Sequence, residues 1–126
     1  MDYAGKYLEN QVNTSNPLKL TIILYEDLLK KFTYIEENFN QHDLESFESD
    51  QALEKLDKAE RIVEELYMGI SHLSEGPFPR IASDYKRVVD GLLQFKETYN
   101  MNIIKGAAIT IRKLKEAYEG VMEKGE

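Results

Sequence analysis

Two histidines are the side chains best able to support metal or acid–base chemistry in this sequence, and their spacing argues against both. His42 and His72 are thirty residues apart. A di-iron site in a helical bundle needs a Glu three residues before a His, but those positions hold Phe39 and Gly69. The sequence also lacks a His-x-x-x-His pair, a Gly-x-Ser-x-Gly turn and a phosphate-binding glycine loop. We therefore expect no catalytic residue, no metal and no cofactor.

His72 alone permits a second interpretation, as the phosphorylated residue of a four-helix phosphotransfer domain. Neighbouring cations stabilise a phosphoimidazole. The sequence instead places Glu75 close by, followed by Gly76, where we expect the helix to end. A histidine near the C-terminus of a helix interacts favourably with the helix dipole and needs no chemistry to explain it. We take this as the simpler interpretation of His72.

The composition describes a single acidic domain. The chain has 126 residues, with 16 basic and 23 acidic side chains, a net charge of −7 and no cysteine. A chain of this length buries about two-thirds of its unfolded surface, so its core needs no disulfide or metal. The basic residues alternate with acidic ones, which argues against nucleic acid as a partner. No apolar run reaches the roughly 18–20 residues of a membrane span, and no secretion signal is visible, so we expect a soluble intracellular domain without membrane insertion.

Large apolar residues recur at steps of three or four along the chain, which is the period of amphipathic helices. The first helix is expected to begin at Asn16-Pro17, and the second is expected to take Asp43 as its cap. Gly76-Pro77 should separate the second helix from the third. The predicted helices cover about residues 17–39, 43–74, 79–99 and 102–123. Four such helices with short connections must pack antiparallel to bury their apolar stripes, so we predict an all-α fold, an antiparallel four-helix bundle within one domain, 1–126.

Residues 1–15 have a weaker helical pattern than the rest of the chain. The spacing of Tyr3, Tyr7, Leu8 and Val12 predicts a short amphipathic turn, which the nearby glycine and asparagines weaken. We interpret the segment as an N-terminal arm or short helix that lies on the bundle. If the bundle exposes apolar grooves, the arm is a candidate to cover one until a partner displaces it.

Apolar residues beyond those needed for the helix seams predict grooves between helices. These extra residues are Ile22, Leu29, Ile62, Tyr67 and Val89. The chain also has eight tyrosines and no tryptophan, and a tyrosine covers apolar surface while its hydroxyl stays in water. The tyrosines that we assign to a binding surface are Tyr7, Tyr25 and Tyr67. The competing interpretation, completion of the core or of a self-dimer seam, applies above all to Leu20, Leu24, Val63 and Leu66.

The run from Tyr7 to Tyr25, YLENQVNTSNPLKLTIILY, resembles the FliS family, the bacterial flagellar secretion chaperones that bind flagellin. The shared pattern is Tyr, Asn three residues later, Val two residues after that, then Thr, Pro, Leu and a closing Leu-Tyr. The resemblance continues at 58–66 (KAERIVEEL), at 114–118 (LKEAY), and at Ile81, Ala82, Tyr85 and Leu92. The departures from the family pattern are Gly91, Lys96 and Tyr118, the last of which stands where the family usually has tryptophan.

The resemblance implies a four-helix chaperone that receives the C-terminal segment of newly made flagellin in the cytoplasm. It would prevent premature polymerisation and present the cargo for flagellar type III secretion. The flagellar export apparatus and an assembly regulator that competes for the same surface are the further partners expected. We expect the flagellin groove and the arm to be formed by Tyr7, Leu8, Asn10, Val12, Leu20, Leu24, Tyr25, Ile62, Val63, Leu66 and Tyr67.

Two other classes of function stay open at this point. The chain fits a helical adaptor or dimerisation module, since periodicity alone predicts only a bundle. It also fits, less well, the phosphotransfer domain considered above. Phosphate transfer to His72 would favour the phosphotransfer domain. Failure to bind flagellin, with retention of another helical partner, would favour the adaptor.

Overall fold

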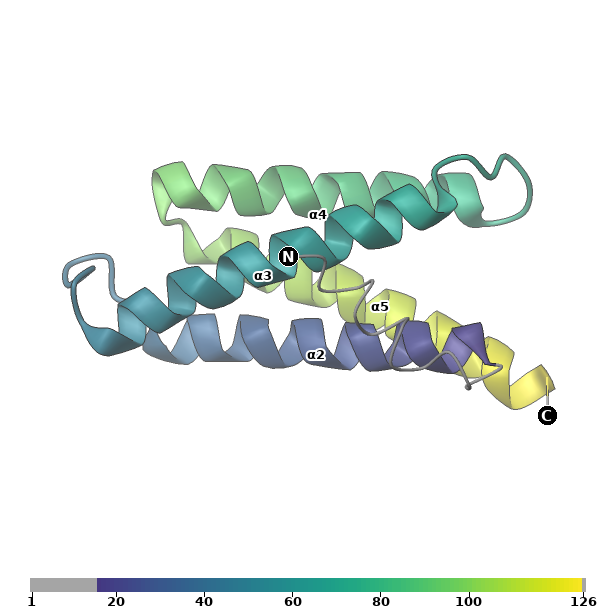
Figure 1. Ribbon diagram of the computed structural model, residues 1–126, viewed down its shortest axis with the longest axis horizontal. Helices are drawn as coiled ribbons and strands as arrows, with labels where there is room; N and C mark the ends of the chain where they lie inside the picture. Colours follow the sequence, from purple (N-terminus) through teal and green to yellow (C-terminus); the bar gives the residue numbers. More distant parts are fainter. Residues whose placement is uncertain (1–15, 126) are drawn as a thin grey trace.

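The structure is a computed structural model, and it describes residues 16–125 of the chain. Over this range the chain forms four α-helices and no strand (Figure 1). The helices are α2 (Pro17–Asn38), α3 (Phe47–Ile70), α4 (Phe78–Thr98) and α5 (Met101–Gly125). Short connections join consecutive helices, which run antiparallel to one another. The predicted all-α four-helix bundle is confirmed.

The four helices form a closed ring in which each helix contacts two neighbours. α2 packs against α3 and α5, and α4 packs against the same two helices from the opposite side. α5 starts beside the C-terminal end of α4 and then runs across to lie beside the N-terminal half of α2 (Figure 1). Since α5 packs most extensively on α2, the seam between α4 and α5 is the least tightly closed part of the ring.

The helix starts show where local hydrogen bonding overrides the apolar pattern. Asn16 caps α2 as predicted, because its side-chain oxygen accepts a hydrogen bond of 3.2 Å from the Lys19 amide. The prediction that α3 begins at Asp43 is wrong. Ser46 is the cap of α3, and its hydroxyl accepts a hydrogen bond of 3.1 Å from the Ser49 amide. The backbone carbonyl of Asp43 instead accepts the Ser46 hydroxyl, so Asp43 belongs to the preceding turn.

The end of α3 also differs from the prediction. The helix stops at Ile70, four residues before the predicted position 74, and Ser71 is its C-cap. The chain then turns through an exposed segment that contains His72 and Gly76, and Gly76 adopts a positive φ of 63°. Glycine tolerates this left-handed conformation because it has no Cβ. His72 therefore lies in a surface turn beyond the helix, and not in a helical position.

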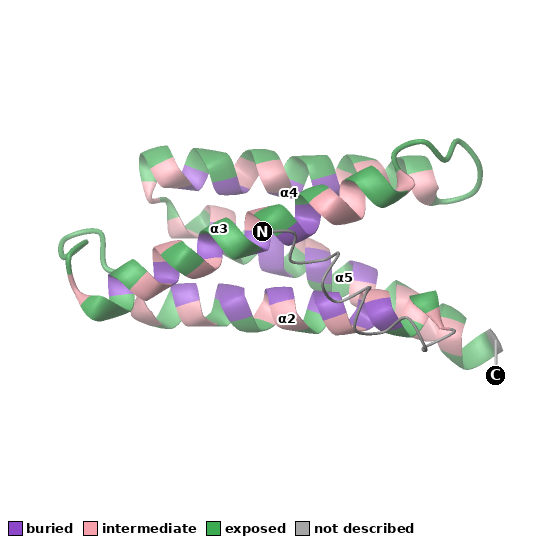
Figure 2. Ribbon diagram, in the orientation of Figure 1, coloured by how far each residue is buried: buried purple, intermediate pink, exposed green. Residues whose placement is uncertain are grey.

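The core runs along the centre of the bundle and takes residues from all four helices (Figure 2). Most of the apolar residues that recur at helical spacing are buried in this core. Leu73 and Val121, which continue the same spacing, are exposed. The positions that are only partly buried are Phe39, Leu53, Leu66, Ile70, Tyr99 and Tyr118. The largest fully buried side chains include two tyrosines, Tyr25 and Tyr85. The remaining ones are Leu28, Phe32, Ile35, Leu56, Ile62, Val63, Leu92, Phe95, Ile104 and Ile111.

Candidate functional site

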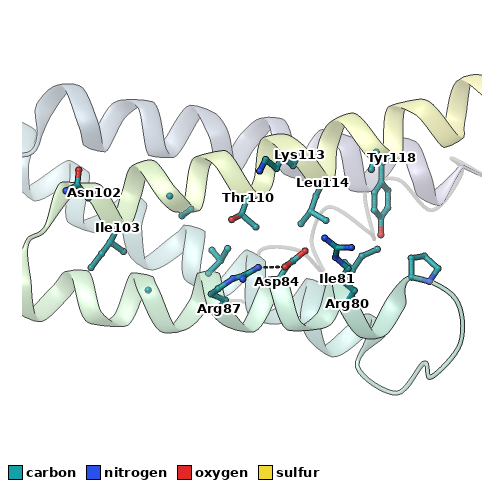
Figure 3. Close-up of a pocket in the computed structure, with 16 residues that line it drawn as sticks. Arg80, Ile81, Asp84, Arg87, Asn102, Ile103, Thr110, Lys113, Leu114 and Tyr118 are labelled. Atoms are coloured by element: carbon teal, nitrogen blue, oxygen red, sulfur yellow. Dashed lines mark hydrogen bonds and ion pairs between the residues drawn. The ribbon is translucent and has the colours of Figure 1, made fainter.

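A long groove of about 700 Å³ lies between α4 and α5 (Figure 3). Ile81 and Val88 on α4 and Leu114 on α5 form its apolar floor, together with Ala107. The groove runs from Asn102 at the α4–α5 connection to the α3–α4 connection at the opposite end, and it opens to solvent along one side. It is larger than the groove between α3 and α4 that is described below.

Small residues on α5 leave this groove open. Gly106, Ala107, Thr110 and Ala117 recur at steps of one, three and seven residues on the side of α5 that lines the groove. A Cβ added at Gly106 would meet no atom within 4 Å, so that position faces open space. At Gly91 on α4 the space is tighter, because an added Cβ would lie 3.2 Å from Cγ2 of Ile103. Small side chains at an interhelical seam are too short to reach the facing helix, and the result is a groove in place of a packed seam.

The charged residues that line the groove are mostly basic. Arg80 and Arg87 lie on α4, Lys113 lies on α5, and Asp84 is the one acidic residue in the lining (Figure 3). Asp84 accepts a hydrogen bond from Arg87 in an ion pair one turn apart. The Asp84 side chain is 19% exposed and that of Arg87 is 70% exposed, so the guanidinium still faces solvent. The groove is therefore locally positive in a chain with a net charge of −7.

A cluster of three tyrosines lies at the end of the groove nearest the α3–α4 connection. Tyr118 lines the groove, and its ring packs edge-on against Tyr25, with centroids 5.4 Å apart. The hydroxyls of Tyr25 and Tyr85 are hydrogen bonded to each other inside the core. Burial raises the pKa of both hydroxyls above the ordinary value, and it outweighs the hydrogen bond from Tyr25 that lowers the pKa of Tyr85. Both groups are therefore neutral near pH 7 and serve as structural hydrogen-bonding groups.

The second groove, of about 290 Å³, lies between α3 and α4 on the other side of α4. Tyr67, Met68 and Val89 give it an apolar surface, and Met68 is 70% exposed. Farther along the same two helices, Lys96 forms ion pairs of 2.8 Å with both Asp57 and Glu60. Burial lowers the pKa of Lys96, but the hydrogen bonds to the two carboxylates outweigh it and hold that pKa above its ordinary value. These ion pairs connect α3 and α4 and close the seam beyond the groove.

The structure brings few of the predicted binding residues to an open surface. Tyr7, Leu8, Asn10 and Val12 lie outside the described residues. Tyr67 and Val89 line the second groove, Leu66 and Leu29 are partly buried, and none of the predicted residues within 16–125 lines the larger groove. The predicted residues that are buried in the core are Leu20, Ile22, Leu24, Tyr25, Ile62 and Val63.

The buried positions change the role that these residues can have. A large apolar side chain gains about 1.5–3 kcal/mol when it leaves water, and the bundle core gives these residues that gain. In this conformation they have almost no surface with which to touch a partner, so they support the shape of the bundle. Their assignment to flagellin binding stays a prediction. In the sequence, the open groove is marked by the small residues of α5. The prediction missed it because it relied on large apolar residues.

Neither the acidic nor the histidine side chains indicate metal chemistry in the part of the chain that the structure describes. Over residues 16–125, no three side chains of the metal-binding types lie together. His72 is exposed in the turn after α3 and lines neither groove. None of the described helices combines the length and the apolar character that crossing a membrane requires.

Comparisons with known proteins agree with this description. A family model described as "Flagellar protein FliS" matches residues 1–125. A solved structure described as a flagellar chaperone from bacteria is similar to this chain with a TM-score of 0.74 and 27% sequence identity. The alignment covers 95% of this chain and 94% of that one. No curated protein sequence matches the chain. The chain therefore belongs to the FliS family of flagellar chaperones.

Proposed function

We propose that this protein is a cytoplasmic export chaperone that binds the C-terminal segment of flagellin. Binding keeps flagellin from polymerising early and presents it to the flagellar export apparatus. Membership of the FliS family supports the flagellar role. The observation that carries the proposal is the open groove of about 700 Å³ between α4 and α5, which has an apolar floor and no occupant from residues 16–125.

The volume of the groove can be expressed as a length of guest helix. A helix about 10 Å across that rises 1.5 Å per residue fills roughly 120 Å³ per residue. The larger groove therefore corresponds to about six residues, or nearly two turns, of a guest helix. By the same estimate the groove between α3 and α4 corresponds to about two residues. We assign the main anchor of the cargo to the α4–α5 groove for this reason.

Binding in this groove follows the physics of an amphipathic helix that lies on an apolar surface. A terminal segment that is poorly ordered when free cannot bury its own apolar stripe. Its folding against Ile81, Val88 and Leu114 would bury that stripe and cover the groove at the same time. Ordering the segment opposes binding by several kcal/mol, so the contact must continue beyond the groove to be tight.

The N-terminal arm and a competing assembly regulator complete the proposal. Tyr7, Leu8 and Val12 give residues 1–15 an apolar side that suits the same groove. In the empty chaperone this segment would compete with flagellin for the apolar floor. A regulator that carries a similar amphipathic helix would compete in the same way, and its release would report that cargo has bound.

Co-purification tests the proposal directly. The chain is expressed with full-length flagellin and, separately, with flagellin that lacks its C-terminal segment. We expect a stable complex with the full-length protein and none with the truncated one. Absence of both complexes would contradict the proposed function, and equal recovery of both would contradict the assignment to the C-terminal segment. Size-exclusion chromatography of the chain alone identifies self-association, which would favour a dimerisation module instead.

A further inference from the structure

We infer that the α4–α5 groove selects a cargo helix with carboxylate side chains on both flanks of its apolar stripe. The inference rests on the proposed function, because it names the chemistry by which the same groove distinguishes one flagellin helix from another. The apolar floor alone cannot do so, because burial of apolar surface has no directional preference. The basic residues along the groove provide the missing selectivity.

Both walls of the groove carry a cation that no acidic side chain neutralises. Arg80 on α4 and Lys113 on α5 are exposed, and neither has an ion-pair partner among residues 16–125 (Figure 3). Arg87 is paired with Asp84, but a guanidinium has five donor hydrogens, and this one is largely exposed. It can accordingly bind a second carboxylate from a guest. A helix in the groove would meet positive charge on either side of its apolar stripe.

The remainder of the protein makes this local charge selective. The chain carries a net charge of −7, so its surface as a whole repels an acidic segment. Salt at physiological strength screens exposed charges beyond about 8 Å. The electrostatic interaction with a bound helix is therefore determined mainly by the charges next to it. An acidic helix is therefore attracted at the groove and repelled elsewhere. Charge complementarity of this kind fixes the site and register of binding more than it raises affinity.

The spacing of the cations predicts a pattern in the guest. Arg80 and Arg87 are seven residues apart, which places them two turns, or about 10 Å, apart along α4. In a guest helix that runs along the groove, residues seven positions apart also lie on the same side of the helix, two turns apart. Carboxylates seven residues apart on the flank that faces α4 would meet both arginines. A further carboxylate on the opposite flank would meet Lys113, with apolar residues between the two flanks directed at the floor.

The test compares two doubly substituted chains with equal net charge. Arg80→Glu with Lys113→Glu reverses both unpaired cations of the groove. Arg61→Glu with Lys105→Glu reverses two exposed cations that line neither groove, and it serves as the matched control. Calorimetric titration with full-length flagellin, at low and at high salt, measures the affinity of each. A third titration uses flagellin in which the acidic residues of the C-terminal segment are replaced by lysine.

We expect the groove reversal to weaken binding on the order of tenfold at low salt, because two attractive pairs become repulsive ones. The control reversal should change affinity by less than about twofold. The lysine-substituted flagellin should bind the groove variant more tightly than it binds the unchanged chain. Equal effects of the two reversals, or no recovery with the substituted flagellin, would overturn the inference. Failure of the unchanged chain to bind flagellin would instead overturn the proposed function.

Discussion

Gly106 provides a way to fill the α4–α5 groove without disturbing the core. It lies within α5 and lines the groove, and a Cβ added there meets nothing within 4 Å. Gly106→Leu would place a four-carbon side chain in the space assigned to the cargo helix. Gly120 is a matched control, because it lies in the same helix, also faces open space and does not line the groove.

The effect on stability has the opposite sign from the effect on binding. Glycine inside a helix is about 0.8–1 kcal/mol less favourable than alanine, and leucine is close to alanine. Gly106→Leu should therefore raise the free energy of unfolding by about 0.5–1 kcal/mol, which raises the melting temperature by roughly 2–5 °C for a chain of this size. Gly120→Leu should raise stability by a similar amount, or by less because it lies closer to the helix end.

Binding should separate the two variants. The new leucine would displace one apolar anchor of the cargo, and a side chain of that size contributes about 1.5–3 kcal/mol when buried. Flagellin should then bind Gly106→Leu about 10-fold to 100-fold more weakly than it binds the unchanged chain. Gly120→Leu should leave the affinity unchanged. Urea unfolding followed by circular dichroism gives the stabilities, and calorimetric titration gives the affinities.

Two results would refute this reasoning. If Gly106→Leu gains stability and still binds flagellin with the original affinity, the α4–α5 groove is not where the cargo sits. If Gly120→Leu loses affinity to the same extent, the loss comes from a stiffer α5 and not from occupation of the groove. A loss of stability in Gly106→Leu would show that the position is not open in solution.

Two further predictions concern the tyrosine pair and the N-terminal arm. Tyr25→Phe or Tyr85→Phe alone leaves the other buried hydroxyl with fewer partners, so each should lower the free energy of unfolding by about 1–2 kcal/mol. The double variant should lose less than the sum of the two single losses. Urea unfolding measures all three. The folded-state pKa of both hydroxyls is raised above 10, so their contribution to the free energy of unfolding is intact below pH 10. Above pH 10 that contribution declines by about 1.4 kcal/mol per pH unit per tyrosine. The double variant should therefore lose less stability than the unchanged chain at alkaline pH, and equal losses would argue against the raised pKa values. Deletion of residues 1–15 should strengthen flagellin binding and increase the fluorescence of an apolar dye if the arm covers a groove, and unchanged values of both would count against that cover.

The periodicity of apolar residues was sufficient to predict the bundle. Leu24, Leu28 and Phe32 recur at one-turn spacing and are all buried, as expected for the core side of a helix. The start of α2 was also readable, because Asn16 and Pro17 each favour a helix start for an independent reason. The start of α3 was not, since Asp43 and Ser46 are both good caps. The choice between them depends on which backbone amides each one reaches, and the sequence does not contain that information.

The location of the groove could not be predicted by the same reasoning, because large side chains pack into the core of a bundle and small ones leave its seams open. Large apolar residues gain most from burial, so a free chaperone draws Tyr25, Ile62 and Val63 into its own core. A groove that stays open in water must instead be formed by residues too small to close it, such as Gly106 on α5. In this bundle the open groove is therefore marked by small residues beside basic ones, and an excess of large apolar residues is a poor guide to it.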